Sequence, residues 1–126
     1  MRIYQLMVEG VFIRAPELGP DVGGFQATFF IRSANAASAV DRVRSVLLDR
    51  MNAHGVATID TGIFRAYFSV RDIWEISEDR MLSVEGRDLG FTFFSIGGAE
   101  RLHLALRRIL LAVFKPQILF FLRRSA

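Results

Sequence analysis

The sequence predicts an α+β domain with a four-stranded, mostly antiparallel sheet and two helices on one face of that sheet. Three observations support this prediction. Four segments alternate apolar and polar residues as strands do, two segments repeat apolar residues at helical spacing, and Gly- or Pro-containing turns separate them. The 126 residues suit one domain spanning residues 1–126, and 52% of them are hydrophobic, which is sufficient for a core without disulfides.

The first two strands are predicted at residues 2–13 and 25–32. The segment between them, residues 14–24, holds two Pro and three Gly, so we expect a long loop that joins the two strands as a hairpin. Two-residue alternation places four apolar residues of the first strand on one face: Tyr4, Leu6, Val8 and Phe12.

Two helices follow from the spacing of apolar residues. The first is predicted to begin after Ser33 or Asn35, either of which can cap it, and to end before Gly55. Its core-facing residues are Ala39, Val43, Val46, Leu47 and Met51. The second is predicted over residues 99–114 and is ended by Pro116. Six of its apolar residues are expected to face the sheet: Leu102, Ala105, Leu106, Ile109, Leu110 and Val113.

The third strand is predicted at residues 63–76 and the fourth at residues 91–96. The apolar face of the third strand is expected to carry Phe64, Ala66, Phe68, Val70, Trp74 and Ile76. Strict alternation also places Asp72 on that face, where a lone carboxylate would be costly to bury. The sequence therefore predicts that Asp72 is either bulged out or paired.

The predicted order of elements is β-β-α-β-β-α, followed by a C-terminal tail. Residues 24–30 resemble residues 90–94, and residues 43–48 resemble residues 106–111. This likeness indicates either two duplicated ββα units or a chance similarity between apolar strand-then-helix segments.

Composition argues against several kinds of active site. The chain has no cysteine, which excludes disulfide frameworks, thiol catalysis and Cys-based zinc sites. Its two histidines, His54 and His103, have neither metal-ligand nor triad spacing, and the acids between residues 72 and 88 are interleaved with arginines as in solvated ion pairs. We therefore predict no catalytic residue, no metal and no cofactor. A small enzyme that uses Asp72 and Glu75 is a minor alternative.

Charge and hydropathy bear on location and partners. The first residues lack the unbroken apolar core of a signal peptide, and no uncharged apolar run reaches the roughly 18–20 residues that span a bilayer, so we expect a cytoplasmic protein with no transmembrane segment. The net charge is +3, but the last 26 residues carry six bases and no acid. The basic residues proposed to form one surface are Arg107, Arg108, Lys115, Arg123 and Arg124. Such a surface suits an anionic partner, or it is simply solvated.

The polar face of the third strand is a second candidate surface. If both helices cover the other face, Arg65, Tyr67 and Arg71 line an open sheet. Cationic and aromatic side chains together suit nucleic acid or an acidic ligand, although a dimer interface and an ordinary solvated face fit equally. With the neighbouring Asp72 and Trp74, these residues are the ligand or interface candidates.

The tail, residues 115–126, is apolar and then basic. Five consecutive residues in it are candidates for a contact between copies of the chain: Ile118, Leu119, Phe120, Phe121 and Leu122. The same residues could instead form an extra strand within the chain or lie on a membrane surface.

These observations favour a small non-enzymatic interaction module that acts through self-association, as a homodimer, or through a protein partner. Regulation in the manner of immunity or antitoxin proteins is one form of that function. The alternative is a protein that binds an anionic surface, either nucleic acid or acidic lipid, through its basic C-terminal segment.

Overall fold

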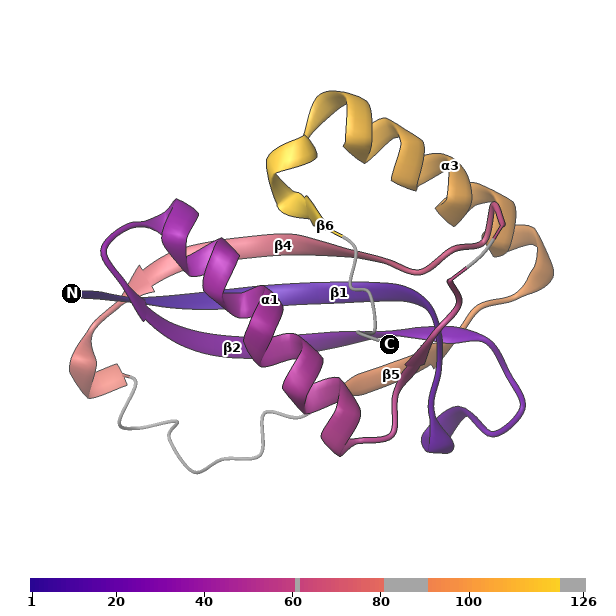
Figure 1. The fold of residues 1–126 in the computed structure, drawn as a ribbon, viewed down its shortest axis with the longest axis horizontal. Coiled ribbons are helices and arrows are strands. Elements are labelled where there is room, and N and C mark those ends of the chain that lie inside the picture. The colour runs from indigo at the N-terminus through magenta and orange to yellow at the C-terminus, as the bar shows by residue number, and fades with distance from the viewer. Residues whose placement is uncertain (61, 81–90, 121–126) are drawn as a thin grey trace.

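The structure, a computed structural model, describes residues 1–60, 62–80 and 91–120 (Figure 1). Its strands are β1 (Arg2–Arg14), β2 (Gly23–Ser33), β3 (Ala57–Thr58), β4 (Tyr67–Ile76), β5 (Thr92–Ser95) and β6 (Leu119–Phe120). Within these residues the long helices are α1 (Ala36–Ala53) and α3 (Gly98–Phe114), and the short 3-10 turns are η1 (Pro16–Leu18) and η2 (Pro116–Ile118).

The strands form one sheet in the order β5-β2-β1-β4-β6, with β3 also paired to β1. Every pairing among the described strands is antiparallel. The predicted α+β class and antiparallel sheet are therefore confirmed. Among the described residues the sheet has six strands and not four, because the two-residue strands β3 and β6 are too short to produce a recognisable alternation.

The helix α1 covers one face of the sheet, as its sequence pattern predicts. The Asn35 side chain caps it, since Asn35 Oδ1 accepts a hydrogen bond from the Ser38 amide at 2.9 Å. Gly55 follows the helix with a φ of 70°, a left-handed conformation that suits glycine. The buried residues of α1 are Ala39, Val43, Leu47 and Met51, and they pack against Leu6, Val8, Ala27, Phe29, Phe68 and Val70 of the sheet.

The helix α3 covers the opposite face, so the prediction that both helices share one face is wrong. Ala105 of α3 packs with Tyr67, whereas the next residue, Phe68, packs with α1. Successive side chains of a strand point to opposite faces. Figure 1 shows α1 crossing β1 and β2, and α3 lying along the β4 side of the sheet. The apolar runs of β1 and β4 leave hydrophobic residues on both faces, and both faces therefore need a covering layer.

A bulge in β1 redirects Phe12. Val11 pairs with Gly24 and Ile13 with Gly23, so Phe12 is an extra residue in β1. Its φ of 63° lies in the left-handed region, which is uncommon for a bulky side chain. The ring packs on the α3 side, with centroids 5.5 Å from Phe64 and 6.2 Å from Tyr67. The expected placement of Phe12 beside Tyr4, Leu6 and Val8 is therefore wrong, and Ile13 takes that place.

A second bulge lies in β4. Met7 pairs with Asp72 and Val8 with Val70, which leaves Arg71 as the extra residue. Beyond it the alternation is inverted, so that Ile73 packs against the α1-side core while Asp72 is exposed. The predicted bulge that removes Asp72 from the core is confirmed. The assignment of Trp74 to the apolar face is wrong, because its side chain is 40% exposed.

The two halves of the chain do not repeat one another. β1 and β2 pair directly, whereas β4 and β5 lie on opposite sides of that pair. The helices α1 and α3 also cover opposite faces. The likeness between the two sequence segments therefore reflects similar apolar patterns and not two ββα units of the same architecture.

Candidate functional site

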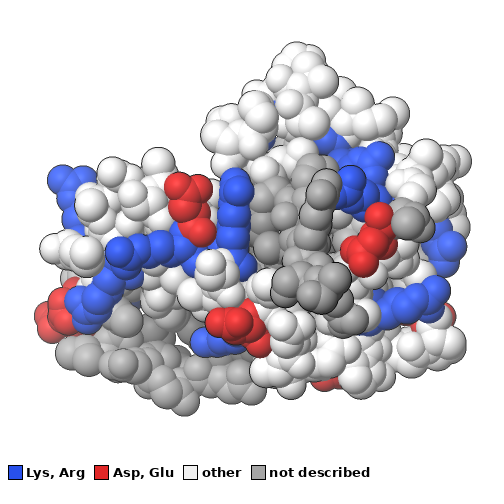
Figure 2. Space-filling model, viewed as in Figure 1, with Lys and Arg blue, Asp and Glu red and all other residues white. Residues whose placement is uncertain are grey.

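The helix α3 exposes its apolar face, contrary to the sequence prediction. Of the residues expected to face the sheet, Ala105 alone is buried. Six large apolar side chains of α3 are 52–75% exposed and are called here the α3 stripe: Leu102, Leu106, Ile109, Leu110, Val113 and Phe114. Figure 2 shows an uncharged surface at the top of the molecule, along the outer side of α3, with Lys or Arg below it toward the sheet. The stripe is too continuous to be ordinary scattered surface apolarity.

The opposite side of α3 faces the sheet and carries arginine. Arg107 Nη1 donates a hydrogen bond to Glu9 Oε1 at 2.7 Å, and Glu9 is 7% exposed. Glu9 lies in β1 directly beside Ser69 of β4, on the face that α3 covers. A buried carboxylate needs a cationic or hydrogen-bonding partner, and Arg107 supplies it. The side of α3 that faces the sheet therefore combines this ion pair with apolar contacts from Leu104, Ala105 and Leu111.

Tyr67 fastens the same helix at a second point. Its hydroxyl donates a hydrogen bond to the Leu104 carbonyl oxygen at 3.0 Å, and its ring is buried. Burial raises the pKa of the Tyr67 phenol to about 12, because the charged phenolate loses its hydration there. The phenol is therefore a neutral structural donor at physiological pH.

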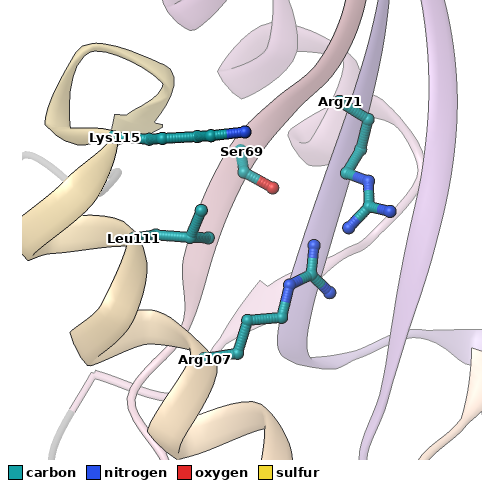
Figure 3. A pocket seen from close by; sticks show the side chains of 5 residues that line it. All are labelled: Ser69, Arg71, Arg107, Leu111 and Lys115. Carbon is teal, nitrogen blue, oxygen red and sulfur yellow. The ribbon is translucent and has the colours of Figure 1, made fainter.

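A pocket of about 240 Å³ lies between α3 and β4 and is lined by Ser69, Arg71, Arg107, Leu111 and Lys115. Figure 3 shows the side chains of Arg71, Arg107 and Lys115 directed toward the space in front of Ser69. Arg71 Nη1 is 4.0 Å from Glu9 Oε1, so the two arginines share one carboxylate. The pocket is thus strongly cationic, with one apolar wall at Leu111.

The fold places the candidate residues of the third strand in different environments. Tyr67 is buried under α3, Arg71 lines the pocket, and Asp72 and Trp74 lie beyond the bulge on exposed surface. Arg65 is partly exposed before the strand begins. The structure brings Arg71 together with Arg107 and Lys115, but it does not form an open sheet face over Tyr67.

The proposed basic surface is likewise divided. Arg107 and Arg108 are half-buried, and Lys115 is exposed at the pocket. Arg123 and Arg124 lie outside the described residues. Two of these five residues therefore line one pocket, while a continuous basic surface is not visible in the described part.

The tail begins as an extra strand. Leu119 is buried, and β6 pairs its backbone with Phe68 and Ser69 of β4. The side chains of Ile118 and Phe120 are not described, and Phe121 and Leu122 lie outside the described residues. The alternative in which the tail packs within the chain thus holds at Leu119, while a contact between copies through the remaining residues stays a prediction.

Sequence reasoning did not select Glu9 or Ser69. The available signal was an acid inside the apolar run of residues 6–13. An acid at such a position requires a base from another element. The arginines of α3 could supply that base. The leucines of the same helix, however, favoured an orientation in which the arginines face away from the sheet.

Neither acids nor histidines gather into a further site within the described residues. No group of three His, Asp or Glu there could hold a metal ion. Of the acids between residues 72 and 88, Glu78 forms a two-bond ion pair with Arg32 at 2.6 and 3.2 Å, which lowers the pKa of Glu78. Glu85 and Asp88 lie outside the described residues. No described helix is long and apolar enough to cross a membrane.

Comparison with known proteins gave no match, whether with protein-family models, with curated proteins or with solved structures. The function must therefore be argued from the two features of α3. Its outer side is an apolar helix face, which suits contact with another protein, and its inner side forms a cationic pocket, which suits an anion.

Proposed function

We propose that this chain is a non-enzymatic interaction module that self-associates through the α3 stripe. The observation that carries the proposal is the exposure of six large apolar side chains on one helix face. Leaving such a face in water is unfavourable, and a contiguous exposed apolar surface commonly marks a protein contact.

The spacing of the α3 stripe favours another helix as the occupant. Leu102, Leu106, Ile109 and Val113 are separated by four, three and four residues, which is the spacing of a coiled-coil seam. The 17 residues of α3 extend for about 25 Å. A second copy of α3 offers the same spacing and length, so a two-fold contact would bury both stripes together.

A contact between two α3 stripes would remove apolar surface from water in both copies. Fully burying one such side chain contributes roughly 1.5–3 kcal/mol, so covering the exposed parts of both stripes contributes on the order of 10–20 kcal/mol. Association costs about 4–15 kcal/mol in lost freedom of motion. Because these two ranges overlap, the affinity depends on how completely the two stripes cover each other. The wider form of the proposal is regulation of a protein partner by this dimer in the cytoplasm.

Sedimentation of the full chain over a range of concentrations tests the proposal. We expect a dimer, and we expect Leu106→Glu to give a folded monomer because it places two charges in the centre of the contact. The matched control is Ser45→Glu, at an exposed position of α1. The control should remain a dimer.

Two outcomes would overturn the proposal. One is a monomer for the unchanged chain at all concentrations, and the other is a dimer that Leu106→Glu leaves intact. Addition of acidic liposomes to the monomeric sample identifies the membrane alternative, since the α3 stripe would then bind lipid and not a second copy.

A further inference from the structure

The inner side of α3 carries a second binding feature, independent of the α3 stripe. Arg107 and Lys115 reach the pocket from α3 and from its C-terminal end, and Arg71 reaches it from the bulge of β4. Because Arg71 is the extra residue of that bulge, it has no direct partner on β1. The bulge is thus the local feature that brings a third cation to the pocket.

The charges of this pocket do not balance among the described residues. Three cationic side chains line it, and Glu9 is the one acid of the described residues that pairs with any of them. No described acidic side chain pairs with Lys115. Like charges held close together repel, and the repulsion is relieved when an anion enters. The excess of about two positive charges therefore favours a dianion over a monoanion.

Ser69 adds an unused hydrogen-bonding group. The residue is fully buried, and its Oγ has no hydrogen-bond partner among the described residues. Ser69 lines the pocket, and its hydroxyl points into the space between the cationic side chains (Figure 3). A buried hydroxyl without a partner is unfavourable, and an anion oxygen in the pocket would accept its hydrogen bond.

The volume of the pocket and the chemistry of its side chains limit which ligands it can bind. The volume of about 240 Å³ is below the roughly 300–1,000 Å³ of sites for drug-sized molecules. A phosphate group carries about 1.5–2 negative charges at neutral pH and has oxygens that accept from both guanidinium and hydroxyl donors. We propose that the pocket formed by Ser69, Arg71, Arg107 and Lys115 binds a phosphate dianion, either free or at the end of a small ester.

Isothermal titration of the full chain with inorganic phosphate and with glycerol phosphate tests this site. We expect saturable binding of phosphate, and acetate, as a monoanion, should bind at least tenfold more weakly. If glycerol phosphate binds as well as phosphate, the pocket takes esters; if phosphate alone binds, it takes the free ion. Absence of saturable binding of both up to about 10 mM would overturn the proposal.

Three variants distinguish binding of phosphate in this pocket from non-specific electrostatic attraction to a basic protein. Lys115→Gln should weaken phosphate binding about tenfold, and Ser69→Ala severalfold. The control is Arg2→Gln, which removes the same charge from an exposed residue at the start of β1 and should change binding less than twofold. Equal effects of Lys115→Gln and Arg2→Gln would show that the pocket is not the site.

Glu9→Gln should change the affinity for phosphate in the opposite direction. It removes the anion that competes for Arg71 and Arg107, so phosphate should bind severalfold more tightly to the variant. Circular dichroism confirms that each variant is folded before titration. Weaker binding by folded Glu9→Gln would contradict the proposed arrangement of charges.

Discussion

The ion pair between Glu9 and Arg107 should stabilise the packing of α3 on the sheet. The pair joins Arg107 Nη1 and Glu9 Oε1 at 2.7 Å, and the two side chains are 24% and 9% exposed. A hydrogen bond to a charged group contributes about 1.5–3 kcal/mol, against about 0.5–1.5 kcal/mol for a neutral one. Glu9→Gln keeps the shape and removes the charge, so it should lower the free energy of unfolding by about 1–2 kcal/mol.

Arg107→Met should cost more, because it leaves the buried Glu9 carboxylate with Arg71 alone, at 4.0 Å. Breaking a buried ion pair typically costs about 3–5 kcal/mol, and we expect the lower end because the pair is partly exposed and Arg71 remains nearby. Urea unfolding followed by circular dichroism measures both values. All samples are compared at one protein concentration, since dimerisation would itself change the apparent stability.

The control for these variants is Glu17→Gln, which removes the same charge from an exposed acid of η1. It should change the free energy of unfolding by less than about 0.5 kcal/mol, as is usual for surface substitutions. If Glu9→Gln is as stable as Glu17→Gln, the reasoning that Glu9 holds the arginine side of α3 inward is refuted.

Two further predictions concern Tyr67 and the close contacts of β2. The pKa of Tyr67 is raised to about 12 in the fold, so the unfolded chain loses its phenol proton first, and stability should be full below pH 10 and fall as pH rises from about 10 toward 12. Ultraviolet titration should show a tyrosine ionising near 12 that Tyr67→Phe removes; a titration unchanged in the variant would contradict this. In Gly24→Ala, the new Cβ would lie 2.6 Å from the Gly10 carbonyl oxygen and 2.5 Å from Phe94 Cζ, so we expect a loss of about 1–3 kcal/mol in thermal unfolding. Gly98→Ala is the control, since nothing lies within 4 Å of its added Cβ, and equal stabilities of the two variants would contradict the packing argument.

The sequence was sufficient to predict those features of the fold that depend on residues close together in the chain. The cap at Asn35, the buried side of α1 and the hairpin of β1 and β2 all follow from local spacing and turn chemistry. A bulge at Asp72 was one of two predicted outcomes, the other being a paired carboxylate, because a carboxylate on an apolar strand face is a conflict that the sequence itself displays.

The orientation of α3 could not be predicted in the same way. Helical spacing shows which residues share a side, but it does not show which side meets the sheet. Here the deciding group, Glu9, lies about a hundred residues away along the chain, and its pairing with Arg107 depends on the sheet order. The cationic pocket was missed for the same reason, since it forms only after the bulge at Arg71 and the inward side of α3 meet.

The central position of β1 has a consequence for how the chain is made. During synthesis, β2 and α1 follow β1 directly, so one side of β1 and one face of the sheet can be completed early. On the other side of β1, residues 3–11 pair with β4, so their backbone groups on that side stay unpaired until β4 has been synthesised. An unpaired apolar strand edge is a template for association with other chains. We therefore expect the chain to be prone to association between the synthesis of α1 and that of β4, and slow, dilute production should favour correct folding.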